Sequence, residues 1–250
     1  MNMQRISALV KMELKKIIRE PAYLFLMILF PAALTLIFGL TFSSIPSGEP
    51  NVSQFTFMVP GLFSYACIFI IMTVAQAFTD DREQGLLKRI NVTPTTSGEF
   101  MGSHVISNTL LSLLQVFIVA LFTFIMGFNP KGGLLGYLLA FVFVGILSIC
   151  SVGLGLITAT ISKNSGIATG LAFIFILPQM FFGTFVPLTD TTRPIAMFLP
   201  SYYVTDSLIN IFEGKLLTEP SIWTNLVIVS IISAIIIVIG IELFKRYGKA

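Results

Sequence analysis

Residues 80–99 of this 250-residue chain read DDREQGLLKRINVTPTTSGE. They form the only long charged interruption between two long apolar runs. The first half combines helix-forming residues with charges of both signs, and Pro94 then breaks the helix. Thr96 and Glu99 follow with the spacing of a capping box, which satisfies free amides where a helix begins. The stretch therefore predicts a short surface helix, a turn and the start of a membrane helix, with an ordinary inter-helix loop as the alternative.

The composition identifies an integral membrane protein. Hydrophobic residues make up 55% of the chain and charged residues 11%, whereas soluble domains carry about 25% charged residues. A net charge of only +3 gives no support for a nucleic-acid partner. Cys67 and Cys150 lie within apolar runs, so we expect buried free thiols rather than a disulfide or a metal pair. We expect the single histidine, His104, at the membrane interface without metal-ligand neighbours.

Six apolar runs predict membrane-spanning helices. They cover residues 22–42, 55–78, 100–128, 134–161, 166–182 and 222–244. The first is longer than the apolar part of a signal peptide, so we expect an uncleaved membrane helix. In the fourth, Gly145, Gly153 and Gly155 would permit close helix approach. The expected fold class is an all-α integral membrane protein with six transmembrane helices in a single domain, 1–250.

Two further segments lie outside these runs. Residues 3–19 carry basic side chains on one half of a helical wheel and apolar ones on the other, with Glu13 interrupting the apolar side. They predict an amphipathic helix on an anionic membrane surface, or a plain basic flank that sets orientation, and the two are compatible. Residues 183–212 contain prolines and a short apolar piece, which predicts re-entrant or interfacial helices at the outer face.

The basic residues predict the orientation of the six spans. One side carries Arg5, Lys11, Lys15, Lys16, Arg19, Arg82, Lys88, Arg89, Lys163, Lys245, Arg246 and Lys249, and the other only Lys131, Arg193 and Lys215. Basic residues concentrate on the cytoplasmic side of membrane proteins. We therefore expect both termini and residues 80–99 in the cytoplasm, with the chain in the cell membrane.

Motifs for catalysis are missing from the sequence. It contains no phosphate-binding loop, no zinc-protease motif and no convincing Ser-His-Asp set. Glu242 is the one carboxylate within an apolar run, and we expect it to snorkel or to pair with nearby basic residues. An integral-membrane enzyme or a scaffold remains an alternative, for which Asp190, Arg193 and Asp206 are the only candidate polar group. Without an ionisable residue at mid-membrane in most spans, the energy source is expected on another polypeptide.

Several motifs together resemble one family. Residues 82–89 (REQGLLKR), followed by Val-Thr-Pro at 92–94, resemble the cytoplasmic signature between the second and third helices of type-2 ABC exporter permeases. Residues 182–188 (FGTFVPL), then Leu-Pro at 199–200 and Asp206, resemble the region after their fifth helix. The amphipathic N-terminus resembles their connecting helix, so the resemblance covers essentially the whole chain.

This resemblance implies the membrane half of an ATP-driven exporter. Two such permeases, identical or homologous, would pair among the membrane lipids, and separate ATPase (nucleotide-binding) subunits would dock beneath them. The chain itself would be no enzyme and would need no cofactor or metal. The expected substrate is an amphipathic drug or lipid, and a polysaccharide or glycolipid is the alternative for the same fold.

Two sets of site residues follow. The predicted ATPase contact within the coupling segment 80–99 consists of Arg82, Glu83, Gly85, Leu86, Leu87, Lys88 and Arg89. The predicted substrate path uses aromatic side chains of helices two and five, which face the dimer axis in the resembled family. These are Phe63, Phe69, Phe173, Phe175 and Phe181, and packing in the core or against lipid is the alternative for each.

Overall fold

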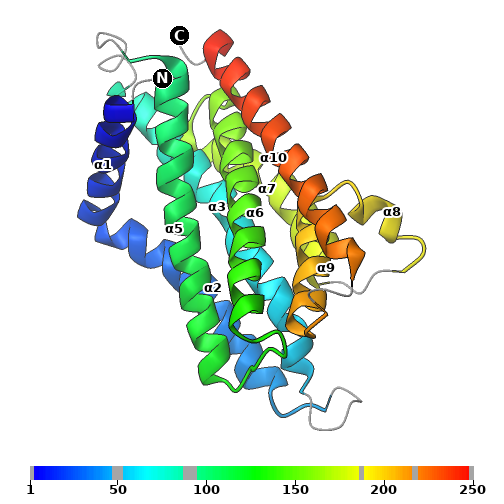
Figure 1. Cartoon of the computed structure of the whole chain (residues 1–250). Helices are drawn as coiled ribbons and strands as arrows, with labels where there is room; N and C mark the ends of the chain where they lie inside the picture. Colours follow the sequence, from blue (N-terminus) through cyan, green and yellow to red (C-terminus); the bar gives the residue numbers. More distant parts are fainter. Residues whose placement is uncertain (1–2, 47–52, 87–94, 186–188, 216–218, 248–250) are drawn as a thin grey trace.

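The computed structural model describes residues 3–46, 53–86, 95–185, 189–215 and 219–247. Over these residues the chain is helical. Its elements are α1 (Met3–Arg19), α2 (Pro21–Phe42), α3 (Gln54–Glu83), α5 (Ser97–Ile125), α6 (Gly133–Ile161), α7 (Ser165–Met180), the π-helical turn η1 (Phe181–Phe185), α8 (Arg193–Ala196), α9 (Pro200–Phe212) and α10 (Pro220–Tyr247). Both chain termini lie at one end of the bundle, here named the terminal end (Figure 1).

Five of the helical segments are long and apolar enough to cross a membrane. They are α3, α5, α6, the continuous run of α7 and η1, and α10. The sixth expected span corresponds to α2, which has 22 residues and begins with proline at its first turn. Its described apolar run, Met27–Phe42, is shorter than the other five. The all-α membrane fold is confirmed, and the count of six spans stays a prediction.

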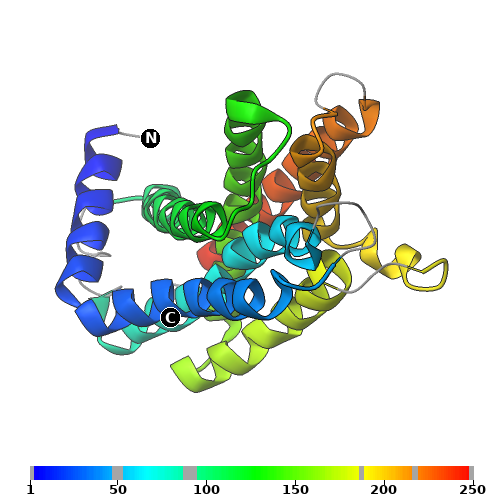
Figure 2. The same ribbon diagram turned by 90° about the horizontal axis from the view of Figure 1, so that it is seen from below.

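α3 lies at the centre of the bundle and packs against α2, α5, α6, α7 and α9 (Figure 2). Its contact with α6 depends on Gly155, where an added Cβ would lie 2.8 Å from the backbone oxygen of Ile71. Gly153 plays the same part against α10, because a Cβ there would lie 2.8 Å from Ile236. Both confirm the predicted close approach. Gly145 does not mark a close approach, because a Cβ added there would lie 3.9 Å from its nearest neighbour.

The segment after α7 fills part of the bundle. α9 has 13 residues, too few to cross a bilayer, yet Val204, Leu208 and Ile211 on it are completely buried. Thr205 donates a hydrogen bond to Ser64 of α3 at 2.9 Å. Ser201 of α9 packs so closely on Gly183 that any side chain there would collide with it. α9 therefore packs among α3, α6 and α10, and its place relative to a membrane surface stays a prediction.

Candidate functional site

α1 is held against the bundle at the terminal end. It lies beside α5 (Figure 1), and its apolar residues Ile6 and Ile17 are each 5% exposed. Glu13, on the same side of the helix, is also buried. The sequence placed this carboxylate on the apolar face of a membrane-surface helix. The structure instead turns that face toward α5 and α3, where charged partners are present.

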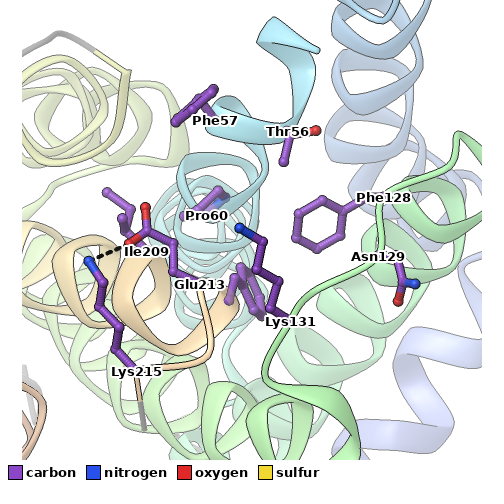
Figure 3. A pocket seen from close by; sticks show the side chains of 10 residues that line it. Thr56, Phe57, Pro60, Phe128, Asn129, Lys131, Ile209, Glu213 and Lys215 are labelled. Carbon is purple, nitrogen blue, oxygen red and sulfur yellow. Dashed lines mark ion pairs between the residues drawn. The ribbon is translucent and has the colours of Figure 1, made fainter. Parts of the chain in front are cut away.

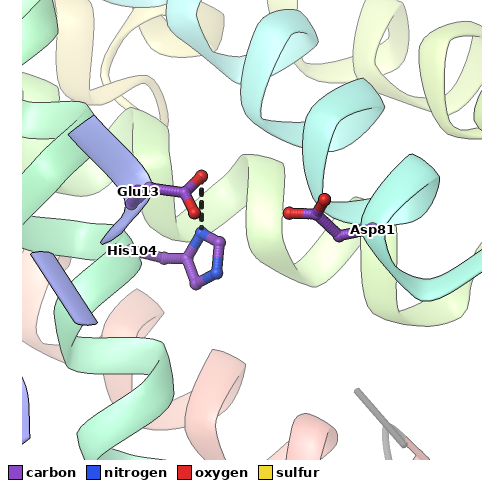
Figure 4. Close-up of side chains that lie close together, drawn as sticks. All are labelled: Glu13, Asp81 and His104. Carbon is purple, nitrogen blue, oxygen red and sulfur yellow. Dashed lines mark ion pairs between the residues drawn. The ribbon is translucent and has the colours of Figure 1, made fainter. Parts of the chain in front are cut away.

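Four side chains from three helices form what we name the charged junction: Glu13 and Lys16 of α1, Asp81 of α3 and His104 of α5. The ammonium of Lys16 donates to Oδ1 of Asp81. Nδ1 of His104 lies 3.6 Å from Oε1 of Glu13. Figure 4 shows Glu13 and Asp81 pointing toward His104 from different helices. Glu13, Asp81 and His104 are each 3% exposed, so the junction is closed to solvent except along Lys16.

This arrangement corrects the prediction for His104. The sequence predicts no metal-ligand neighbours for it, whereas one ligand atom from each of Glu13, Asp81 and His104 lies within 4.8 Å of the others. Its place at the membrane interface stays a prediction. The three residues are far apart in the chain, so only the packing of α1 on α3 and α5 brings them together. Burial raises the pKa of Glu13, and the charge of Lys16 partly opposes that rise.

The predicted coupling segment begins differently from its prediction. A separate surface helix was expected from Asp80, but α3 continues without a break through Glu83. Gly85 then turns the chain at φ +76°, a conformation that glycine adopts readily. Leu86 is half-buried. Leu87, Lys88 and Arg89, the rest of the predicted ATPase contact, lie outside the described residues.

Arg82 and Glu83 hold the short connection between α6 and α7. Arg82 donates from its guanidinium to the backbone oxygens of Thr160, at 3.2 Å, and of Ser162. These carbonyls end α6, where helix oxygens lack partners within the helix. Glu83 accepts a hydrogen bond from the backbone N–H of Ser165 at 3.1 Å, where α7 begins. A cation thus meets a helix C-terminus and an anion a helix N-terminus, as the helix dipoles favour.

The capping box at the other end of the coupling segment is confirmed. Glu99 N–H donates to Oγ1 of Thr96 at 3.2 Å, and Thr96 N–H donates to Oε2 of Glu99 at 3.0 Å. Arg5 of α1 approaches the same carboxylate at 3.9 Å. The start of α5 is therefore fixed by its own cap and lies next to α1.

An apolar groove of about 650 Å³ opens between α2, α3 and α7. Of the five predicted path residues, it contains Phe69 and Phe173. The ring of Phe69 stacks on Phe30 with 4.6 Å between centroids. The remaining lining includes Met27, Tyr65, Met72, Thr73, Gln76, Ile176, Leu177 and Met180. Gln76 donates to Thr169 of α7 at 2.8 Å, which adds a polar contact between α3 and α7.

The other three predicted path residues lie elsewhere. Phe63 is completely buried in the main core, where its ring meets Phe212 edge-on at 5.4 Å. Phe175 is partly buried against a core cluster formed by residues of α3, α6 and α7. Phe181 is 47% exposed. Phe30 and Met27 of the groove were not predicted, because nothing in the uniformly apolar α2 indicates which face meets α3.

A second pocket, of about 410 Å³, lies at the end of the bundle away from the termini. Figure 3 shows Lys131, from the turn between α5 and α6, extending toward Pro60. Lys215 forms an ion pair with Glu213 at 2.7 Å beside it. The lining of this pocket combines aromatic rings with charged groups, whereas the described lining of the groove carries no charged side chain.

Other expectations from the sequence have clear outcomes. Cys67 and Cys150 are free and buried, as predicted. Glu242 forms ion pairs with Lys245 at 3.6 Å and Arg246 at 3.3 Å, which confirms local pairing. Asp206 accepts a hydrogen bond from Asn225 of α10 at 2.9 Å. Asp190 and Arg193, its suggested companions in an enzyme site, are exposed.

The comparison with known families covers most of the chain. Residues 4–212 match the family described as ABC-2 type transporter. The matched region extends from α1 through α9 and so includes the charged junction, the connection between α6 and α7, and the groove. No curated protein matches the chain at a significant level.

Proposed function

The chain belongs to the ABC-2 type transporter family, and we propose that it exports amphipathic drug-like or lipid-like molecules with energy from separate ATPase subunits. It is a multi-pass membrane component of a transporter, and in our proposal it has no enzymatic activity of its own. In our proposal two permeases, identical or homologous, form the pathway in the cytoplasmic membrane. The ATPase subunits dock on the coupling segment, residues 80–99, at the terminal end.

The observation that carries the coupling proposal is the double contact of Arg82 and Glu83. These adjacent residues end α3 and hold both the last carbonyls of α6 and the first amide of α7. Asp81, one position earlier, is paired with Lys16 of α1. A force applied to the coupling segment would therefore reach α1, α3, α6 and α7 directly. An ordinary inter-helix loop needs no such set of connections.

The groove supports an amphipathic substrate rather than a sugar polymer. Its lining is aromatic and aliphatic, with Thr73 and Gln76 among its few polar side chains. Flat rings and flexible methionines give broad apolar contact to ligands of different shape. A polysaccharide would need many hydrogen-bonding groups along its path. The groove has a volume of about 650 Å³, which is within the range of small-molecule sites.

The coupling proposal is tested by reversing the charge at the end of α3 and by replacing the apolar side chain of Leu86, just beyond it, with a charged one. We expect the double substitution Glu83→Arg, Leu86→Asp to release the ATPase or to uncouple ATP hydrolysis from transport, while the permease still inserts. Losing one member of an interfacial charge pair costs about 2–5 kcal/mol, largely by stranding the other. Co-purification of the ATPase and substrate-stimulated hydrolysis in proteoliposomes measure the two effects.

Glu242→Arg is the matched control for that experiment. It makes the same charge reversal at an exposed position near the end of α10, and we expect wild-type docking and hydrolysis. If the double variant also retained both wild-type values, residues 83–86 would only connect helices and would not contact the ATPase.

The orientation is a separate proposal that cysteine labelling tests. We expect a membrane-impermeant thiol reagent added to intact cells to modify Lys215→Cys but not Ser97→Cys. The reason is the unequal distribution of basic residues between the two sides. Labelling of Ser97→Cys from outside would reverse the proposed orientation.

A further inference from the structure

We propose that the charged junction binds one divalent transition-metal ion, with Zn²⁺ as the best fit, through Glu13, Asp81 and His104. The inference rests on the geometry of these residues and does not depend on the transported substrate or on the ATPase. The site would join α1 to α3 and α5, because each helix supplies one ligand.

The ligand atoms are close enough to meet one ion. One nitrogen of His104 and one carboxylate oxygen from each of Glu13 and Asp81 lie within 4.8 Å of one another. Ligand atoms around one tetrahedral zinc ion stand about 3.4 Å apart, given bond lengths of about 2.1 Å. The separations in the structure therefore exceed those of a bound set by at most about 1.4 Å. Figure 4 shows the three side chains converging.

A second observation supports a metal-binding role for the two carboxylates. Oε2 of Glu13 and Oδ2 of Asp81 are both buried and make no hydrogen bond within the described chain. Their residues are each only 3% exposed. Buried carboxylate oxygens are normally hydrogen-bonded or bound to a metal, because removal from water is costly for a charged group. A single cation bound between them would satisfy both oxygens.

The charges leave room for a cation. Glu13 and Asp81 can supply two negative charges, and Lys16 supplies one positive charge through Oδ1 of Asp81. Lys16 uses that oxygen, so Oδ2 remains the ligand atom for the metal. The ammonium thus orients Asp81 in the way that outer partners commonly orient metal-bound carboxylates.

The donor set selects the kind of metal. One imidazole and two carboxylates suit Zn²⁺ and other divalent transition metals, whereas Mg²⁺ and Ca²⁺ favour sites made of oxygen alone. The rings of Phe78 and Phe100 meet His104 edge-on, at 5.1 and 4.6 Å between centroids. They restrict the orientation of the imidazole. A fourth position is left for a water molecule.

The chain offers a clean test because His104 is its only histidine. The full chain, purified in detergent with a histidine-free tag, is treated with a chelator and titrated with Zn²⁺ or Co²⁺. We expect one ion per chain, measured by elemental analysis after desalting, and a rise in melting temperature on binding. His104→Gln, Glu13→Gln and Asp81→Asn should each weaken binding at least about tenfold, since even outer-shell changes have that effect.

Two controls isolate the site. Glu242→Gln removes an exposed carboxylate near the same end of the bundle, and Cys67→Ser with Cys150→Ser removes the thiols. Both should bind the ion as the wild type does. No bound ion in the wild type, or undiminished binding in His104→Gln, would overturn the site.

If a variant at Glu13, Asp81 or His104 fails to fold, X-ray absorption spectroscopy of zinc bound to the wild-type protein still shows whether an imidazole binds the ion. Imidazole scattering supports the site, and its absence or sulfur scattering refutes it. Either result leaves the coupling proposal to its own test, because that test reads ATPase docking instead of metal binding.

Discussion

α3 contributes to both the charged junction and the apolar groove, yet the two regions use opposite kinds of side chain. At the junction, Asp81 has one defined partner in Lys16, and its neighbours Arg82 and Glu83 each bind defined backbone groups. In the groove, Phe69 and Phe173 offer surface without a specific polar partner. Directional contacts can transmit a displacement, whereas apolar surfaces tolerate different occupants. The difference matches the division between coupling and substrate passage in the proposed function.

Phe63 is predicted from the sequence to line the substrate path, but the structure buries it in the core. Phe63→Ala should lower the free energy of unfolding by about 3–5 kcal/mol, because it opens a cavity at a completely buried site. Phe181→Ala, at an exposed site of the same residue type, should have little effect. Denaturant titration of the purified chain measures both. A stable Phe63→Ala variant with altered transport would return Phe63 to the substrate path.

The junction should respond to loss of one charge. Lys16→Met should lower the free energy of unfolding by about 2–3 kcal/mol, because it strands the buried carboxylate of Asp81. The lysine is itself partly exposed, which keeps the effect below that of a fully buried pair. Lys15→Met, one residue earlier and exposed, is the matched control and should be near neutral. Thermal unfolding in detergent compares the stabilities of the two variants with that of the wild type.

A second substitution distinguishes charge from packing at this site. Adding Asp81→Asn to Lys16→Met removes the stranded charge and should recover part of the lost stability. Equal losses in the single and double variants would show that the Lys16 stem, and not its charge, stabilises the junction.

Local patterns predicted much of this molecule. Thr96 and Glu99 form a capping box through neighbouring backbone groups, so their spacing alone was sufficient. The order of the apolar helices followed from length and composition for the same reason. The continuation of α3 through Asp80–Glu83 was missed, because charged residues with good helix propensity fit a helix end or a separate surface helix equally well.

Contacts across long sequence distances could not be predicted in this way. Glu13, Asp81 and His104 meet only after α1 packs on α3 and α5, and the one available signal was a carboxylate on an apolar helix face. Phe63 and Phe69 differ by the rotation of α3, but that helix is apolar on most sides. Hydrophobic periodicity therefore could not tell which ring faces the core and which the groove.

A substitution in the groove should have the smallest effect on stability but a clear effect on substrate preference. Phe173 is 40% exposed, so Phe173→Ala should change the free energy of unfolding by less than about 0.5 kcal/mol. Removing its ring widens the groove beside Phe69, and substrate preference should move toward bulkier amphipathic molecules. Ile174→Ala is the matched control, because Ile174 is the next residue, is 62% exposed and is not part of the groove lining. Transport of a size-graded substrate series in proteoliposomes compares the two. Identical substrate preferences in the two variants would mean that Phe173 faces lipid only. The groove would then have no demonstrated role in substrate passage to set against the coupling role of the junction.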